Sequence, residues 1–185
     1  LVLISDFFPP ESYQTLRDMG MKVYVYNTPS NFEEIKASIL ELGQVVGELE
    51  KGKQIVAEMD TRIQKLQEKL GDIKEKRKVL FMHAFGAYYS PKGTFGDTCS
   101  LAGVEDVTRS LNYSQPCTLS QETIVQLNPD SFVIGDWNFD GEHSPDVLKE
   151  ELLSNQSYMT TNAGKNRSII VIPSAHLLTC SQHFV

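Results

Sequence analysis

A long amphipathic segment, residues 48–75, constrains the fold more than any other stretch of the chain. Its apolar side chains recur at steps of three and four, which keeps one apolar stripe on one side of a helix and leaves charged and amide side chains on the rest. The stripe consists of Ile55, Met59, Ile63, Leu66, Leu70 and Ile73. At about 1.5 Å per residue, such a helix spans roughly 40 Å. We therefore interpret it as a rigid spine that joins two α/β parts.

Short runs rich in Val and Ile lie on both sides of this helix and alternate with helical patterns. The first run, LVLIS at residues 1–5, is continuously apolar, which is typical of a buried strand. Strands alternating with helices predict an α/β class with Rossmann-like lobes and a mostly parallel sheet. Residues 83–93 are interpreted as a long aromatic loop, followed by a helix that Thr94 would cap. The further expected strands are Lys22–Tyr26, Lys78–Met82, Ser131–Ile134 and Ser168–Ile172, and the further expected helices include Glu11–Met19, Thr118–Leu127, Pro145–Ser154 and a last one that begins at Ser181.

A weak internal repeat supports two similar lobes. LVLISD at residues 1–6 is similar to SFVIGD at residues 131–136, and each is followed by a proline, a helix and a second strand that leads to a Pro-Ser pair. With the long helix between the two copies, three parts are predicted. They are the end of an N-terminal lobe (residues 1–47), the spine helix (residues 48–77) and a C-terminal lobe (residues 78–185).

Charge and composition exclude several classes of function. The formal charge of −7 over 185 residues argues against a nucleic-acid surface, and no apolar run is long enough to cross a membrane. Cys99, Cys117 and Cys180 are too few and too irregularly spaced for a disulfide framework or a zinc site. The sequence begins within a strand-like run, so we expect a fragment of a longer chain, with any signal sequence upstream.

Several ordered stretches resemble one family, the substrate-binding proteins of bacterial ABC importers that carry iron siderophores, haem or cobalamin. LVLISD with the later MGMKVYVYN resembles the end of the family's N-terminal lobe, and GELEKGKQIVAEMDTRIQKL resembles its inter-lobe helix. KGTFGDTCSLAGVEDVT resembles the start of the C-terminal lobe, where a helix carries a Leu-Ala-Gly turn. LSQETIVQLNPDSFVIG and RSIIVIPSAHLLTCSQHFV resemble its later parts.

The resemblance implies two lobes with a ligand cleft between them and a single long helix as hinge. It implies capture of a ferric siderophore, haem or cobalamin and delivery to a membrane permease, with no catalysis and no resident cofactor. It also implies an extracytoplasmic location, in a periplasm or as a cell-surface lipoprotein, and the loss of most of the N-terminal lobe from this chain.

Ligands of open α/β sheets gather outside the carboxyl ends of the strands. The loops after the predicted strands offer aromatic rings with a few polar groups, which suit a bulky chelate, corrin or haem. A tyrosine or histidine there could also bind haem iron directly. The candidate ligand-binding residues are Tyr88, Tyr89, Trp137, His83, His176, Phe85 and Asn138. Burial in the core is the alternative for His83 and Phe85.

Two acidic residues are candidates for permease docking. Members of the resembled family are thought to dock through one carboxylate at the top of each lobe, paired with arginines. Glu11 follows Asp6 by five residues and Glu142 follows Asp136 by six, so the two occupy similar places in the two repeats. The alternatives are ordinary solvated carboxylates, with Asp140 or Glu150 in place of Glu142.

Three other functions fit the sequence less well. A bare transition-metal site would need His83, His143, His176 and His183 to converge, but these are scattered. An enzyme is disfavoured because residues 93–96 lack the features of phosphate- and dinucleotide-binding loops and no nucleophile elbow is present. A coiled-coil arm is the third, since Met59, Leu66 and Ile73 are spaced by sevens, but the heptads are too few.

Overall fold

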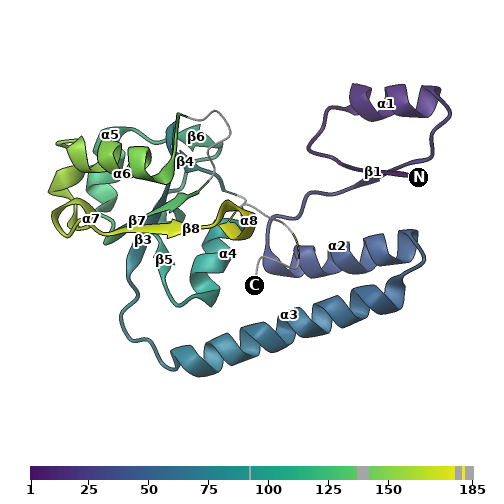
Figure 1. Ribbon diagram of the computed structural model, residues 1–185, viewed down its shortest axis with the longest axis horizontal. Coiled ribbons are helices and arrows are strands. Elements are labelled where there is room, and N and C mark those ends of the chain that lie inside the picture. The colour runs from purple at the N-terminus through teal and green to yellow at the C-terminus, as the bar shows by residue number, and fades with distance from the viewer. Residues whose placement is uncertain (92, 137–141, 178–180, 182–185) are drawn as a thin grey trace. The chain divides into compact units, whose positions relative to one another are not determined.

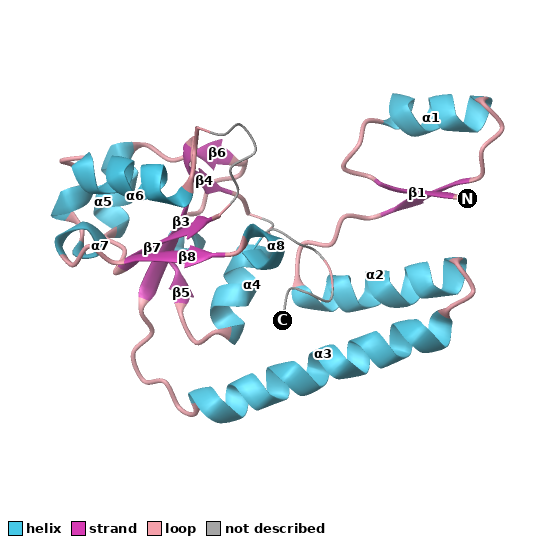
Figure 2. Cartoon of the chain, in the orientation of Figure 1, coloured by secondary structure: helices cyan, strands magenta, loops and turns pink. Residues whose placement is uncertain are grey.

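The computed structural model describes residues 1–91, 93–136, 142–177 and 181 (Figure 1). Helices alternate with strands along most of the chain (Figure 2), so the predicted α/β class is confirmed. Two compact units are present, one formed by Leu1–Thr61 and one that begins at Arg62. The boundary falls inside the long helix α3 (Leu49–Leu70), and the division into three parts stays a prediction.

The first unit contains one pair of parallel strands. β1 (Val2–Ser5) pairs with β2 (Val23–Tyr26) over four residue pairs, and α1 (Pro10–Asp18) connects them. The Asp6 carboxylate, directly after β1, accepts a hydrogen bond from the backbone N–H of Thr28 at 2.7 Å. The Thr28 hydroxyl also donates to this carboxylate and is the main reason that the pKa of Asp6 is lowered. The bond from the Thr28 backbone lowers the pKa further.

The prediction that LVLIS is a buried strand is wrong. None of the β1 side chains is fully buried, and Leu3 is 39% exposed. The described part of the first unit contains only these two strands, so the pair lacks the neighbouring strands that bury a central strand on both sides.

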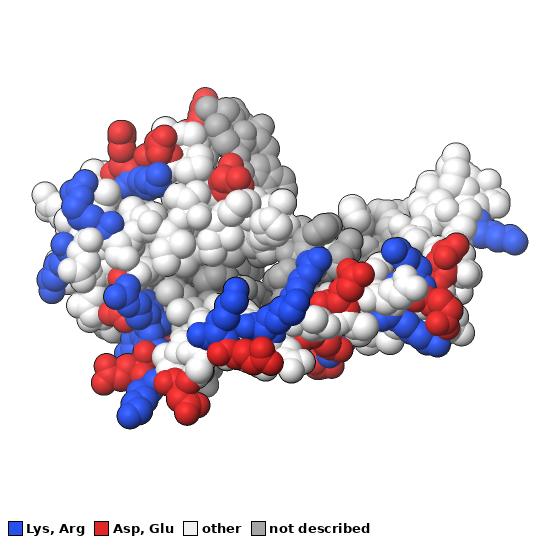
Figure 3. All heavy atoms as spheres, turned by 60° about the horizontal axis from the view of Figure 1, so that its bottom comes forward, with Lys and Arg blue, Asp and Glu red and all other residues white. Residues whose placement is uncertain are grey.

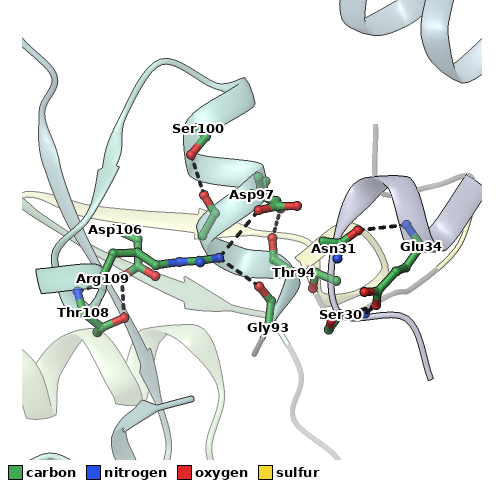
Figure 4. Close-up of polar contacts among 12 residues, drawn as sticks. Ser30, Asn31, Glu34, Gly93, Thr94, Asp97, Ser100, Asp106, Thr108 and Arg109 are labelled. Atoms are coloured by element: carbon green, nitrogen blue, oxygen red, sulfur yellow. Dashed lines mark hydrogen bonds and ion pairs between the residues drawn. The ribbon is translucent and has the colours of Figure 1, made fainter. Parts of the chain in front are cut away.

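α2 (Phe32–Val45) and α3 form a close helical hairpin. Asn31 caps α2 by accepting from the backbone N–H of Glu34 at 2.8 Å (Figure 4). A Cβ atom placed on Gly52 of α3 would lie 3.2 Å from the carbonyl oxygen of Ile39, so the two backbones approach where a larger residue would not fit easily. Lys36 bridges the helices through Asp60 at 3.1 Å.

The predicted spine helix is confirmed, but α3 ends at Leu70, five residues before the expected end. Gly71, at φ +56°, takes the left-handed conformation that stops a helix. Basic and acidic side chains alternate along the exposed side of α3 (Figure 3), while Met59 and Ile63 on its apolar stripe are buried within the chain. The middle of the stripe is thus covered, while Ile55, Leu66 and Leu70 are half-buried.

The second unit contains a mixed sheet with β3 (Lys78–His83) and β7 (Ser131–Gly135) at its centre. β3 pairs in parallel with β7, and β7 with β8 (Ile169–Ile172), while β4 (Gly86–Tyr89) runs antiparallel to β3. The sheet is therefore mostly parallel, as predicted. The remaining elements are α4 (Thr94–Leu101), β5 (Glu105–Asp106), the 3-10 turn η1 (Val107–Ser110), β6 (Cys117–Thr118), α5 (Gln121–Leu127), α6 (Pro145–Ser154), the 3-10 turn η2 (Tyr158–Thr160), α7 (Asn162–Lys165) and α8 (Ser174–Leu177).

Helices cover both faces of this sheet (Figure 1). Alternate residues of a strand point to opposite faces, so Leu80 and Phe132 pack on one face with side chains of α5, α6 and α7, such as Ile124. Val79 and Val133 pack on the other face with Cys99 of α4 and Leu177 of α8. β7 and the middle of β3 are therefore buried on both faces, as central parallel strands are, whereas β8 at the edge of the sheet is partly exposed.

Two local predictions in this unit are wrong. β4 lies within the stretch expected to be a loop. The sequence did not indicate this hairpin, because the turn between β3 and β4 uses Ala84 and Phe85 rather than the usual Asn-Gly signal. Thr94 is the first helical residue of α4, and Gly93 occupies the cap position without a side-chain bond. A short helix, α8, spans Ser174–Leu177. The helix expected from Ser181 lies, apart from that residue itself, outside the described residues and stays a prediction.

Candidate functional site

The carboxyl ends of β7 and β8 are tied together by one aspartate. The Asp136 carboxylate accepts a hydrogen bond from the backbone N–H of Ser174 at 2.6 Å. This bond is the main reason that the pKa of Asp136 is lowered. Ser174 lies two residues beyond Ile172, which pairs with Gly135 at the end of β7. In the first unit, Thr28 likewise lies two residues beyond Tyr26, which pairs with Ser5 at the end of β1. The predicted internal repeat therefore extends to this hydrogen bond.

A cavity of about 200 Å³ opens at the same edge of the sheet. Phe81 and His83 come from the end of β3, and Tyr88 comes from β4. Arg109 comes from η1, and Leu177 from α8 closes part of the wall. The remaining lining residues are Ser90, Gly93, Thr94, Phe95, Gly96, Asp106 and Thr108. The cavity thus combines aromatic walls with polar and charged groups at the strand ends, as small-molecule sites do.

The two neighbouring tyrosines of β4 have different surroundings. Tyr88 is 53% exposed and lines the cavity. Tyr89 is buried, its hydroxyl lies 3.2 Å from the carbonyl oxygens of both Leu111 and Tyr113, and its ring packs edge-on against the Tyr113 ring. Successive residues of a strand face opposite sides. The structure therefore places Tyr88 at the site and Tyr89 in the core.

His83 lies between two cavities. It lines the first cavity and also a second one of about 180 Å³, whose wall includes Glu151 and Tyr158. The residue is solvent-accessible, but its ring packs 4.2 Å, centroid to centroid, from the Phe81 ring. Partial burial of the ring lowers the pKa of His83. The imidazole is therefore biased towards its neutral form, which can both donate and accept a hydrogen bond.

Arg109 is a residue of this site that the sequence did not reveal. Its Nη2 atom donates to the carbonyl oxygen of Gly93 at 3.2 Å and lies 3.6 Å from a carboxylate oxygen of Asp97 (Figure 4). The guanidinium lies against α4 at Gly96, where a Cβ atom would lie only 2.0 Å from its Nε atom. A glycine inside a helix often marks a close approach by another group, and this was the available signal.

Asp106 fixes the turn that carries Arg109. Its buried carboxylate accepts from the backbone N–H of Thr108 at 3.0 Å and from the Thr108 hydroxyl at 2.8 Å. Both bonds go to Oδ1 of Asp106, and they start η1, the turn that contains Arg109 (Figure 4). The position of the guanidinium is thus set from both sides, by η1 and by α4.

The other predicted site residues are dispersed or lie outside the described residues. Phe85 is 76% exposed at the β3–β4 turn, with its ring 5.8 Å from the His143 ring. His176 is exposed on α8. Trp137 and Asn138 lie outside the described residues. Glu11, in the first turn of α1, and Glu142, just before α6, are both exposed.

The described residues contain neither a grouped set of metal ligands nor a helix suited to cross a membrane. In residues 1–91, 93–136 and 142–177, no three His, Cys, Asp or Glu side chains are grouped so that they could hold a metal ion. His183 lies outside this part of the chain. No helix in the described part of the chain has the length and apolarity that a membrane span requires.

Comparison with known proteins agrees with this architecture. Residues 1–176 match the periplasmic binding protein family. The chain is 28% identical over 130 residues to YvrC of Bacillus subtilis (strain 168), an uncharacterised ABC transporter substrate-binding lipoprotein, covering 68% of this chain and 41% of YvrC. It is 29% identical over 143 residues to FatB of Vibrio anguillarum (strain ATCC 68554 / 775), a ferric-anguibactin-binding protein, covering 75% of this chain and 43% of FatB.

The fold is also found in solved structures. The periplasmic haem-binding protein RhuT from Roseiflexus sp. RS-1, in its apo form, superposes with a TM-score of 0.82 at 19% identity, over 98% of this chain and 70% of RhuT. The chain spans less than half the length of the two curated relatives that it matches. The match over residues 1–176 nevertheless covers nearly the whole sequence. The chain therefore belongs to the periplasmic binding protein family.

Proposed function

We propose that this chain is part of the substrate-binding component of an ABC import system, which captures a metal chelate outside the cytoplasm and delivers it to a membrane permease. Ferric siderophores and haem are the favoured ligands, and cobalamin is a further candidate. The observation that carries the proposal is the cavity at the carboxyl edge of the second unit, where Phe81, Tyr88 and Arg109 meet. Aromatic walls provide flat contact area for a bulky chelate, and a few polar groups orient it.

Family membership supports the same function. FatB is named for binding a ferric siderophore, and RhuT for binding haem. Both are named as binding proteins, which agrees with a function without catalysis. A lipoprotein anchor is a further proposal, suggested by the description of YvrC.

The direct test is a fluorescence titration of the full-length natural protein with ferric siderophores, haem and cobalamin. Trp137 is the only tryptophan of the chain and follows β7 by two residues. We expect saturable quenching by one ligand, reduced in the Trp137→Phe variant. A folded protein that responds to none of the three ligands would contradict the proposal.

Permease docking is proposed to use Glu11 and Glu142. Both are exposed. Glu11 follows β1 and Asp6 along the chain, and Glu142 follows β7 and Asp136. A charge reversal at either position should lower ligand uptake by cells and leave ligand affinity unchanged, since exposed charges act mainly on association and specificity. Uptake by Glu11→Lys and Glu142→Lys equal to that of the wild type would remove these residues from the proposal.

A further inference from the structure

We infer that the second cavity, of about 180 Å³, is a separate small-ligand site that takes an organic cation with an apolar body about the size of one ring. An aromatic or alkyl amine in its ammonium form belongs to this class. The site lies in the second unit, between α6, η2 and the carboxyl ends of β3 and β7. The inference goes beyond the proposed function, because chelate binding is assigned to the first cavity.

The second cavity lies on the opposite face of the sheet from the first. Met82 and Ile134 line the second cavity and belong to the core cluster that includes side chains of α6. Phe81 and Leu177 line the first cavity and belong to the cluster that includes Cys99 of α4. Phe81 and Met82 are successive residues of β3, and successive side chains of a strand point to opposite faces. The sheet therefore separates a ligand under α6 from a ligand in the first cavity.

The floor of the second cavity is apolar. One face of α6 and its cap lines the cavity, through residues at helical spacing: Leu148, Glu151, Leu152 and Asn155. The two leucines are buried, and they provide apolar surface together with Ile134 of β7. An engineered cavity of about 150 Å³ with apolar walls binds benzene in another protein. The second cavity therefore has room for one ring with a small substituent.

Four polar side chains line the same cavity and keep hydrogen-bonding groups available. They are His83, Glu151, Asn155 and Tyr158. Asn155 accepts through Oδ1 from the backbone N–H groups of Ser157 and Tyr158, which leaves the two N–H donors of its amide. Among the described residues, none forms a hydrogen bond or an ion pair with the Glu151 carboxylate, the Tyr158 hydroxyl or the His83 ring nitrogens. The polar groups of the lining are therefore available to a ligand.

The charge of the lining favours a cation. Glu151 carries the only fixed charge among the described residues that line the cavity. Burial lowers the pKa of His83 and raises that of Tyr158, so both side chains are biased towards their neutral forms at pH 7. Lys149, the lysine of α6, pairs with Asp146 at 3.0 Å rather than with Glu151. The carboxylate of Glu151 is thus left to attract a positive group.

An ammonium group matches these partners. It has donors and no acceptor, so Glu151 would hold it through a charge-assisted hydrogen bond. Tyr158 offers a hydroxyl acceptor and an aromatic ring, and aromatic faces attract cations. The Tyr158 ring is held by the Phe132 ring, with 5.9 Å between the centroids. A carboxylate ligand would instead meet Glu151 as a like charge, and a neutral alcohol would lose the charge attraction.

The test compares three probes of matched size, which are benzylammonium, benzyl alcohol and benzoate. They share one ring and differ mainly in charge. The variants of the full-length natural protein are Glu151→Gln, Tyr158→Phe and Glu150→Gln. Glu150 is exposed on α6 and does not line the cavity, so its replacement is a matched control for the change in charge. NMR titration measures the affinities, because ligands of so few atoms bind weakly, and circular dichroism checks folding.

We expect saturable binding of benzylammonium and binding of the other two probes that is about 10-fold weaker or less. Glu151→Gln should weaken benzylammonium binding by about 10-fold, as for a lost hydrogen bond to a charged group. Tyr158→Phe should weaken it by about two- to tenfold, as for a neutral hydrogen bond. Glu150→Gln should bind the probe as the wild type does. Ferric siderophores and haem should bind Glu151→Gln as they bind the wild type.

Three results would overturn the inference: a folded wild type without saturable binding of benzylammonium, equal affinities of Glu151→Gln and Glu150→Gln for it, or a preference for benzyl alcohol or benzoate. A loss of chelate affinity in Glu151→Gln would overturn the separation of the two sites. Binding of benzylammonium as expected, by a protein that binds no chelate, would contradict the proposed function and support this inference.

Discussion

The two parallel strand pairs of this chain have the same local construction and different surroundings. β1 with β2, and β7 with β8, each pair over four residues. In each pair an aspartate accepts the N–H group two residues beyond the end of the partner strand. However, β7 is buried from Ser131 to Ile134, whereas none of β1 is fully buried. The short-range sequence therefore sets the geometry of a strand pair, and the neighbouring elements decide how much stability it gains.

The largest expected effect concerns the closed core of the second unit. Cys99 packs between α4 and the sheet. Burial is the main reason that the pKa of its thiol is raised to about 12, and the negative charge of nearby Asp106 adds to this effect. Since the thiolate is the reactive form, Cys99 should react with a thiol reagent at pH 8 about a thousandfold more slowly than a free cysteine. Mass spectrometry of the labelled protein checks this, with the half-buried Cys117 as internal reference. Fast labelling of Cys99 would show that this core is open.

The next effect compares equivalent positions of the two repeats. Ile134 in β7 is fully buried, and its counterpart in β1, Ile4, is partly exposed. Ile134→Ala should lower the free energy of unfolding by about 2–5 kcal/mol, and Ile4→Ala by about 1 kcal/mol. Urea denaturation followed by circular dichroism measures both. Equal losses would mean that β1 is covered as well as β7 is.

A smaller effect concerns the two aspartates that tie the strand ends. Both have a pKa below the usual 3.8, so each contributes stability above that pH and loses it as the pH falls through the lowered value. Asp6→Asn and Asp136→Asn should each lower the melting temperature slightly at pH 6, and by less at pH 2. A gap that is the same at both pH values would contradict the carboxylate hydrogen bonds as its cause.

The smallest effect separates the two units by pH. Residues 1–61 contain no histidine, whereas His83 lies at the edge of the second unit. Its pKa is lowered from 6.5, so its contribution to stability is complete above pH 6.5 and is lost as the pH falls through the lowered value. An NMR titration should place the His83 pKa below 6.5, and His83→Gln should flatten the melting temperature between pH 7 and pH 5. An unshifted pKa would mean that the ring is fully hydrated.

Much of the fold was predictable because its signals are local. The apolar periodicity of α3, the Ser120 cap of α5 and the Pro145 start of α6 all lie within a few residues of the feature that they determine. The internal repeat correctly predicted two similar parallel pairs. β4 was missed because glycine and alanine form half of it and a two-residue turn without turn signals precedes it.

The candidate site was harder to predict because it depends on contacts between distant residues. Arg109 reaches Gly93 across 16 positions of the sequence, and no spacing rule connects them. Whether Tyr88 or Tyr89 faces the cavity depended on the register of β4 with β3, and that strand had been interpreted as a loop. The strand-end rule did point to the edge of the sheet where the cavity lies, since His83 and Tyr88 both line it.

The most direct measurement is amide hydrogen exchange of the full-length natural protein, with and without the ferric chelate that it binds most tightly. Binding at the proposed site should slow exchange in residues 83–90, 93–97 and 106–109, which surround the cavity. Residues 161–168, at the opposite edge of the sheet, should be unchanged. Slowed exchange confined to residues 161–168, with none around Arg109, would contradict the account.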